Sequence, residues 1–240
     1  MAATSQRRKK PKRAVALNFS GGFDSRLSAI RLARSFDEVH LLSYDTGAEL
    51  LREHSSDSAR IVRERVNVPV KHFDIDVSRL WRTLLKNNFT SVRYVCALCK
   101  LSMHTHTILH CLQHDIRHAA DGSNKHQDIN PEQMDTTLGV YRELYAKYGI
   151  EFLTPVWDAT GEDEDRQLAD AGVPQVRRVT FGLPGVKGQN WTIQPICMLT
   201  PFTLAFTRFP GWPLRKDVAE QLIRDNFDFA VRYIEQHKNR

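Results

Sequence analysis

A segment near the N-terminus combines the residue types that bind phosphate. Its six residues follow a short apolar run and precede a stretch with apolar residues at helical spacing: Ser20, Gly21, Gly22, Phe23, Asp24 and Ser25. Glycines between a strand and a helix let the backbone approach a phosphate, and the helix N-terminus adds N–H groups and a positive dipole end. We therefore predict a phosphate-binding loop here; the alternative is a tight turn whose serines and aspartate are incidental.

Asp24 places an acid in a loop that should bind anions. Holding Mg²⁺ against the phosphates is the simplest role for its carboxylate. The spacing of the glycines matches neither the Walker A pattern nor the Gly-x-Gly-x-x-Gly of dinucleotide-binding folds. The loop is therefore of a third kind.

The segment resembles the SGGxDS loop of the PP-loop ATP pyrophosphatases, and the resemblance extends over about residues 14–200. It implies a Rossmann-like enzyme that cleaves ATP to AMP and pyrophosphate while adenylating a substrate oxygen. The six loop residues would then bind the pyrophosphate portion of ATP. The resemblance also implies that the end of the second strand lies near the adenosine and that a later turn completes the site: Tyr44, Asp45 and Thr46, then Gly122 and Asn124. Asp121 departs from the small residue that the family usually has at that turn.

The cysteines are the next chemical feature: Cys96 and Cys99 form a Cys-x-x-Cys pair, and Cys197 lies far along the chain. Two thiolates are too few for a closed zinc site, which has four ligands. The pair plus Cys197 resembles the arrangement in cluster-dependent PP-loop thiolases, which implies a 4Fe-4S cluster with one open iron that carries sulfur. The segment Cys96–Met103 also resembles 4-thiouridine synthetases, which implies persulfide chemistry, here on Cys99. Two buried core thiols are the alternative.

Residues near this pair allow further interpretations. Lys100 could lower the pKa of Cys99 and favour the thiolate, or it could be a solvated helix residue. Cys111 is expected in the core. Three histidines recur every four residues, which suits a partly exposed helical stripe better than a metal site: His106, His110 and His114.

These features support three functions. The first is ATP-dependent adenylation followed by sulfur insertion, with a sulfur donor or a cysteine desulfurase as partner. The second is an amidating or nitrile-forming ligase that uses ammonia, because the segment Phe152–Pro174 resembles 7-cyano-7-deazaguanine synthases; their four-cysteine zinc site is missing from this sequence. The third is a nucleotide-binding module without chemistry. Replacing Cys99 should abolish only the first activity.

Apolar runs of strand length alternate with stretches of helical spacing. We predict strands over 14–19, 39–44, 68–75, 116–120 and 151–155, and helices after the loop, over 49–66, 77–85, 98–112, 131–148 and 215–236, and from Thr160. This predicts an α/β fold, Rossmann-like and doubly wound, whose mostly parallel sheet has helices on both faces and a C-terminal helical extension. Ligands bind beyond the carboxyl ends of such strands, where the loop, Asp45–Gly47 and Asp121–Asn124 would meet. We expect a disordered basic tail (1–13), an ATP-binding domain (14–175) and an extension packing on the site (176–240).

The 240 residues are 41% apolar and 26% charged, an ordinary globular balance. The net charge of +6 resides in the first thirteen residues, which hold six basic and no acidic side chains. Because the rest of the chain is neutral, we favour a small, nucleobase-like substrate. The basic tail leaves transfer RNA as the alternative substrate. Without a signal peptide or an apolar run of membrane-spanning length, we expect a cytoplasmic protein with reduced thiols and no membrane partner. The aromatic residues between 191 and 212 could form core, substrate pocket or a homodimer surface.

Overall fold

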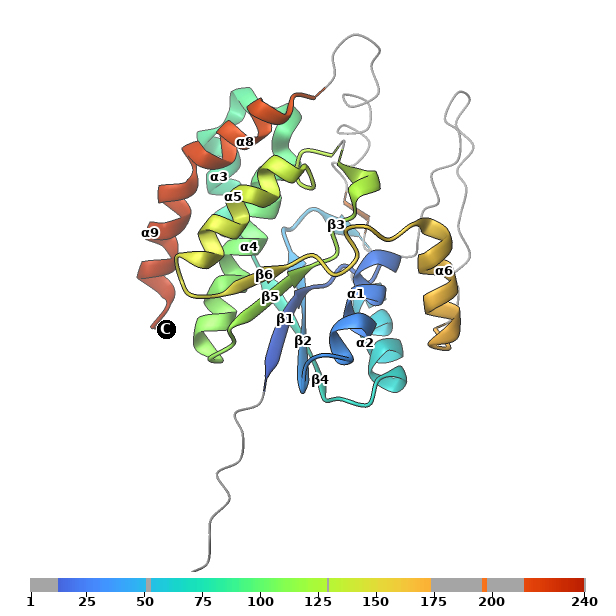
Figure 1. The fold of residues 1–240 in the computed structure, drawn as a ribbon. Coiled ribbons are helices and arrows are strands. Elements are labelled where there is room, and N and C mark those ends of the chain that lie inside the picture. Colours follow the sequence, from blue (N-terminus) through green and yellow to red (C-terminus); the bar gives the residue numbers. More distant parts are fainter. Residues whose placement is uncertain (1–12, 51–52, 129, 174–195, 198–213, 240) are drawn as a thin grey trace, which may run out of the picture.

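The computed structural model describes residues 13–50, 53–128, 130–173, 196–197 and 214–239. Its centre is a five-stranded sheet in which all neighbouring strands are parallel (Figure 1), in the order β4 (Val70–Asp76), β2 (Glu38–Asp45), β1 (Ala14–Asn18), β5 (His118–Asp121) and β6 (Glu151–Leu153). β1 suits the middle position because its short apolar side chains are buried on both faces. The predicted fold class is confirmed.

Helices cover both faces of the sheet. Alternate side chains of β1 belong to different clusters: Val15 and Leu17 pack on the side of α1 (Phe23–Ala33) and α2 (Glu53–Arg65), and Ala16 packs on the other side. On that side two helices contact the sheet, α4 (Val95–Gln113) and α5 (Asp135–Ala146). Three more helices pack against those two: α3 (Ser78–Asn87), α8 (Lys216–Asp225) and α9 (Phe227–His237). Two short 3-10 segments, η1 (Phe89–Tyr94) and η2 (Lys125–Gln127), lie in the connections.

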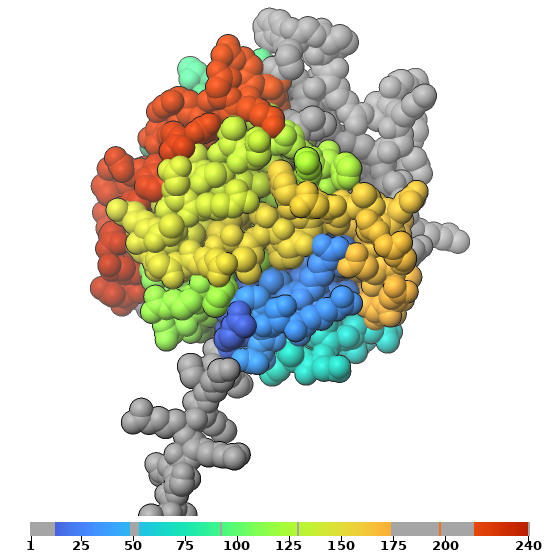
Figure 2. Space-filling model, in the orientation of Figure 1, coloured from blue at the N-terminus to red at the C-terminus, as the bar shows by residue number. Residues whose placement is uncertain are grey.

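α6 (Gly161–Asp170) packs beside α1, on the side of the molecule away from α8 and α9 (Figure 2). It begins as predicted: Thr160 is the N-cap, its hydroxyl accepts a bond from the Asp163 N–H at 3.2 Å, and acidic side chains occupy the first turn. None of the helices in the described ranges is long and apolar enough to cross a membrane.

Two predicted helices differ in their starts. Residues 49–50 form a strand, β3 (Glu49–Leu50), which pairs antiparallel with β7 (Ile196–Cys197), and α2 begins only at Glu53. This ladder joins segments far apart in the chain, so local spacing does not reveal it. Cys96 and Cys99 do not precede a helix but lie in the first turns of α4, because its buried side starts at Val95 and Ala97.

The predicted helix 215–236 is broken in two at Asn226. The side-chain amide of Asn226 donates to the carbonyl of Leu222 at 2.8 Å and exchanges hydrogen bonds with Asn88. An asparagine that bonds the backbone of the preceding turn competes with helix continuation. Residues 1–12 and most of the 176–213 segment, with its aromatic residues, lie outside the described residues, so the tail and the domain boundaries stay predictions.

A histidine contact joins β2 to the C-terminal half of α4, at the edge of the sheet where the strands begin. His40 Nδ1 lies 2.8 Å from His110 Nε2, and His40 Nε2 lies 2.7 Å from Glu38. Of the predicted stripe, His110 is therefore buried against β2, His106 is half-buried and His114 is exposed. Burial lowers the pKa of His110 to about 3 and also lowers that of His40, so both rings are neutral near pH 7.

We expect this pair to make stability depend on pH. Below pH 6.5 the unfolded chain takes up protons that the folded chain refuses, so stability is fully present above that pH and falls as the pH drops towards 3. The loss should be up to about 1.4 kcal/mol per pH unit for each such histidine. Urea unfolding at pH 7.5, 6.5 and 5.5 should show a smaller slope for His110→Gln and the wild-type slope for the exposed control His126→Gln. Equal slopes in all three proteins would contradict this explanation.

Candidate functional site

The predicted phosphate loop connects β1 to α1 at the carboxyl edge of the sheet. Gly21 has φ +79°, a conformation that favours glycine, and a Cβ there would lie only 3.0 Å from Ser58 Oγ of α2. The Ser25 hydroxyl donates to the carbonyl of Gly22 at 3.0 Å, and the Gly22 N–H donates to Ser20 Oγ at 3.3 Å. The loop is thus fixed by its own serines, as well as by α2.

Gly122 brings the turn after β5 against this loop. β5 lies next to β1, with Asp121 opposite Asn18, so the turn follows directly beside the loop. A Cβ on Gly122 would lie 3.1 Å from the backbone nitrogen of Ser25. The first and the last segments of the predicted nucleotide site are therefore in backbone contact, and any residue other than glycine would push the backbone at Ser25 away.

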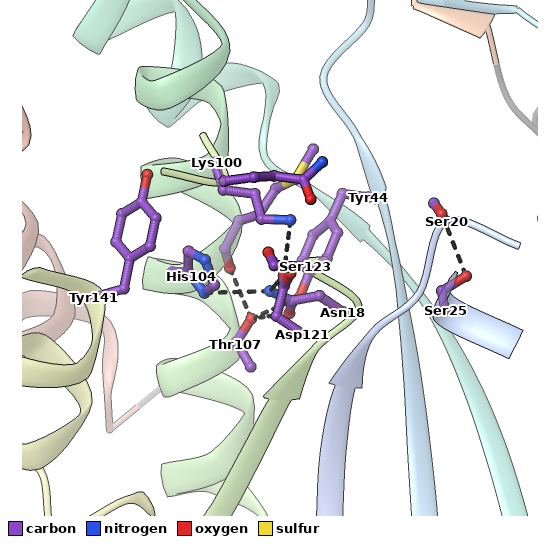
Figure 3. Close-up of polar contacts among 12 residues, drawn as sticks. Asn18, Ser20, Ser25, Tyr44, Lys100, His104, Thr107, Asp121, Ser123 and Tyr141 are labelled. Atoms are coloured by element: carbon purple, nitrogen blue, oxygen red, sulfur yellow. Dashed lines mark hydrogen bonds and ion pairs between the residues drawn. The ribbon is translucent and has the colours of Figure 1, made fainter. Parts of the chain in front are cut away.

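Behind the loop, Asn18 is the centre of a buried polar network (Figure 3). Its amide nitrogen donates to Asp121 Oδ2 at 3.0 Å and lies 3.2 Å from His104 Nδ1. Its amide oxygen accepts from the hydroxyl of Tyr44 at 2.6 Å and from that of Thr107 at 2.7 Å. Asn18 therefore ties three strand ends and α4 together immediately before the phosphate loop.

An ion pair closes the network on the side of α4. Lys100 Nζ lies 2.7 Å from Asp121 Oδ2, and the Ser123 hydroxyl donates to Oδ1 at 2.5 Å. Burial alone would raise the pKa of Asp121, but the positive charge of Lys100 outweighs it and holds the pKa below the usual range. Burial lowers the pKa of His104 to about 3, so the ring is neutral. Lys100 is therefore not a solvated residue: its side chain is 18% exposed and neutralises Asp121, while its predicted effect on Cys99 stays a prediction.

The residues predicted to lie near the adenosine differ in what they do. The hydroxyl of Tyr44 belongs to the Asn18 network, and burial raises its pKa well above the usual value. Asp45 accepts a bond from the Gly47 N–H at 2.8 Å, and Thr46 accepts one from the Ala48 N–H at 3.2 Å. These two side chains shape the turn after β2, and contact with adenosine stays a prediction.

Cys96 and Cys99 lie in the first turns of α4, next to Lys100. The hydroxyl of Tyr141 donates to the Ala97 carbonyl of this helix at 3.0 Å, so the phenol lies beside the cysteine pair. Burial raises the Tyr141 pKa, and negative charge on Glu132, Asp121, Cys99 and Cys96 raises it further. The cysteine pair is therefore at the same edge of the sheet as Asp121. As predicted, Cys111 is buried in the core.

The three cysteines predicted to hold an iron–sulfur cluster do not form a metal site as they stand. Cys197 lies in β7, opposite Glu49 of β3. Among the described residues, no group of three or more His, Cys, Asp or Glu side chains is arranged to hold a metal ion. The cysteine pair thus lies on α4, and the three-cysteine cluster with Cys197 stays a prediction.

Asp24 faces the turn after β5 and α6. It accepts bonds from the amides of Asn124 (3.4 Å) and Gln127 (3.0 Å), and Asn124 also donates to Glu164 Oε1 at 2.7 Å. Burial, then the hydrogen bond to Asp24 and the charge of Asp24, together raise the pKa of Glu164 to about 8. Two carboxyl groups sharing a proton form a place where a divalent cation fits.

Sequence reasoning missed several of these residues: Asn18, His104, Thr107, Gln127, Glu132 and Glu164. A polar residue ending an apolar strand was a usable signal for Asn18, because a buried amide requires partners. Glu164 belongs to an acidic helix start, where acids are expected because they interact favourably with the positive end of the helix dipole. Glu162 and Asp163 in the same turn serve that purpose. The others could be found only from the packing of α4 and of the turn after β5.

Comparison of the sequence with protein-family models and with curated proteins gives no significant match. Among solved structures, the fold is similar to a predicted subunit of tRNA methyltransferase from Methanocaldococcus jannaschii, with TM-score 0.42 and 18% identity over 65% of this chain and 75% of that one. The fold is also similar to NMN synthetase from Francisella tularensis, with TM-score 0.47 and 14% identity over 68% of this chain and 63% of that one. A third similar structure is the U34-tRNA thiolase NcsA from Methanococcus maripaludis, solved with its 4Fe-4S cluster. It gives TM-score 0.47 and 14% identity over 96% of this chain and 74% of that one. At such identities, similarity of fold does not imply shared activity.

Breaking the buried ion pair should be costly. Asp121→Asn leaves the ammonium of Lys100 without its carboxylate and should destabilise the protein by about 3 kcal/mol. Adding Lys100→Met removes the unpaired charge and should restore most of that loss. The measurement is urea unfolding of both single variants and the double variant; additive losses would show that the two residues do not stabilise each other.

The contact at Gly122 should matter for nucleotide binding more than for folding. Gly122→Ala must displace the backbone at Ser25, so ATP affinity should fall by on the order of 10-fold. Gly139→Ala is the matched control: it lies inside α5, nothing is within 4 Å of the added Cβ, and it should stabilise the protein by roughly 0.5–1 kcal/mol. Calorimetric titration with ATP tests both, and unchanged affinity in Gly122→Ala would count against an ATP site at this loop.

Proposed function

We propose that this chain binds ATP at the loop Ser20–Ser25 and uses it to adenylate an oxygen atom of its substrate. One observation carries the proposal: the loop is preformed at the carboxyl edge of the sheet, between Gly21 with φ +79° and Gly122, whose Cβ would lie 3.1 Å from Ser25 N. The N-cap of α1 is Gly22, which has no side chain to cap the helix. An uncapped helix start behind a glycine loop suits a phosphate group.

The proposed chemistry divides into two displacements. The substrate oxygen attacks the α-phosphorus of ATP, an oxygen–phosphorus bond forms, and the bond to the β-phosphate oxygen breaks with release of pyrophosphate. A nucleophile then attacks the activated carbon, and AMP leaves with the former substrate oxygen. The loop contributes by binding the leaving pyrophosphate and by holding both reactants in line.

Asp24 and Glu164 are the residues that would hold Mg²⁺. Their carboxyl groups contact each other, and this contact contributes to the raised pKa of Glu164, about 8. Mg²⁺, when bound, supplies positive charge beside the phosphate oxygens. Asn124 and Gln127 fix the orientation of Asp24 through their amide donors, at 3.4 and 3.0 Å.

We further propose that the nucleophile is sulfur and that Cys99 delivers it, supplied by a sulfur donor or a cysteine desulfurase. Cys96 and Cys99 support this role because they begin α4, and the neighbouring Lys100 reaches Asp121 at the end of β5. A helix N-terminus also favours a thiolate. For the substrate we propose a nucleobase-like small molecule, since the chain without its basic tail is neutral.

Release of AMP and pyrophosphate tests the function. The wild type should convert ATP to both products in the presence of purine or pyrimidine bases, their nucleosides, or bulk transfer RNA, with a persulfide donor as sulfur source and a thiol reductant that regenerates Cys99. Asp24→Asn and Ser25→Ala should lower the rate by on the order of 100-fold, through lost charge neutralisation and positioning. ATP binding without AMP formation on any substrate would leave a nucleotide-binding module instead.

Cys99→Ser separates sulfur insertion from amidation. With a persulfide donor, this variant should still release pyrophosphate and form the adenylated substrate, but it should yield neither thiolated product nor the AMP that sulfur attack releases. With ammonia as nucleophile, the product yield of an amidating enzyme would be the same in both proteins. If transfer RNA is the active substrate, salt-dependent binding with and without residues 1–13 shows whether the tail supplies the contact.

A further inference from the structure

Arg26 follows the phosphate loop directly, and no acidic side chain in the described part of the chain pairs with it. It lies in α1 with 0% of its surface exposed, and none of its three guanidinium nitrogens has a hydrogen-bond partner. Burial lowers the pKa of Arg26, and no nearby acid in the described part of the chain offsets this. Arginine is almost never fully buried unless it is paired, because an uncompensated buried charge is strongly destabilising.

The surroundings of the guanidinium show where it lies. Its central carbon is 4.8 Å from the centroid of the Phe23 ring, and Phe23 is the first residue of α1. Long side chains on a helix lean towards its N-terminus, so Arg26 extends back over the first turn. The guanidinium therefore lies over an aromatic ring in the first turn of the helix, which follows Gly21 and Gly22 of the loop.

A purely structural role does not explain this arginine. Leu27 and Ile30 on the same helix pack into an apolar cluster that Phe23 joins, and an apolar residue at position 26 would extend it. Arg31, one turn further along, shows what a structural arginine has here: it donates to Gln167 Oε1 at 3.0 Å and to the carbonyl of Pro155 at 2.7 Å. The guanidinium of Arg26 is removed from water, but it makes no such hydrogen bonds.

We propose that Arg26 binds the pyrophosphate portion of the nucleotide, an inference that rests on the proposed ATP site. A guanidinium offers two parallel N–H donors that match two phosphate oxygens, and the Phe23 ring beside it limits the space in which it can move. The unpaired charge before binding then finds its counter-charge in the ligand. Because pyrophosphate leaves in the first displacement, Arg26 would stabilise the leaving group and would contact neither AMP nor the sulfur-accepting carbon.

Arg26→Met tests the proposal, with inorganic pyrophosphate and AMP as separate probes in calorimetric titrations. Pyrophosphate affinity should fall on the order of 10- to 100-fold, as expected for lost hydrogen bonds to a charged group, while AMP affinity stays unchanged. Without ligand, the variant should unfold at the same temperature as the wild type or higher, since it removes an unpaired charge. Arg31→Met, the control, should lose thermal stability and keep pyrophosphate affinity.

Each contrary outcome is informative. If the wild type binds ATP and pyrophosphate and Arg26→Met binds them equally well, the inference fails and the proposed ATP site stands. An equal loss for AMP would also overturn it, because the contact would not be with pyrophosphate. If the wild type binds neither ATP nor pyrophosphate, both proposals fail. Should Arg26→Met not fold, Arg26→Lys keeps the charge but not the paired donors; unchanged pyrophosphate affinity there would overturn the proposal.

Discussion

The ion pair between Lys100 and Asp121 fixes the start of α4 against the centre of the sheet. Asp121 ends β5, pairs with Asn18 of β1, and through Ser123 orders the turn that contains Gly122. Without the ammonium at 2.7 Å, the carboxylate would be buried without a counter-charge. The phosphate loop, the turn after β5 and the cysteine pair therefore depend on one electrostatic contact, which sets their relative positions.

α4 carries polar contacts at both of its ends, and they differ in kind. At the carboxyl edge Lys100 meets a charged partner, whereas at the opposite edge His110 meets the neutral ring of His40. At the opposite edge the contact between α4 and β2 is between rings that burial keeps uncharged, and the second nitrogen of His40 bonds the carboxylate of Glu38, which pairs with Lys71. α4 is therefore bound to the sheet near both of its ends, and these two contacts limit how far its N-terminal cysteines can shift relative to β1.

The sequence predicted what local patterns encode and missed what distant contacts decide. The parallel α/β fold, the loop and the cap at Thr160 follow from spacing and from residue types within a few positions. The Asn18 network joins residues 86 to 103 positions apart, so no local pattern reveals it. For the same reason the sequence drew attention to Asp24, whose magnesium role stays a prediction, but not to its neighbour Glu164 on α6. Arg26 looked like an ordinary helix residue because burial, rather than identity, makes it unusual.

The two glycines on either side of the loop have a kinetic consequence. Gly21 packs against α2 and Gly122 against Ser25, so backbone encloses the loop from two directions before any ligand arrives. A site with so little left to order gives up little conformational entropy on binding. Association would then require no slow rearrangement of this loop, and related nucleotides would differ mainly in how fast they leave. If the proposed function holds, discrimination between ATP and its products would be expressed in residence time, with the adenylate retained while pyrophosphate leaves.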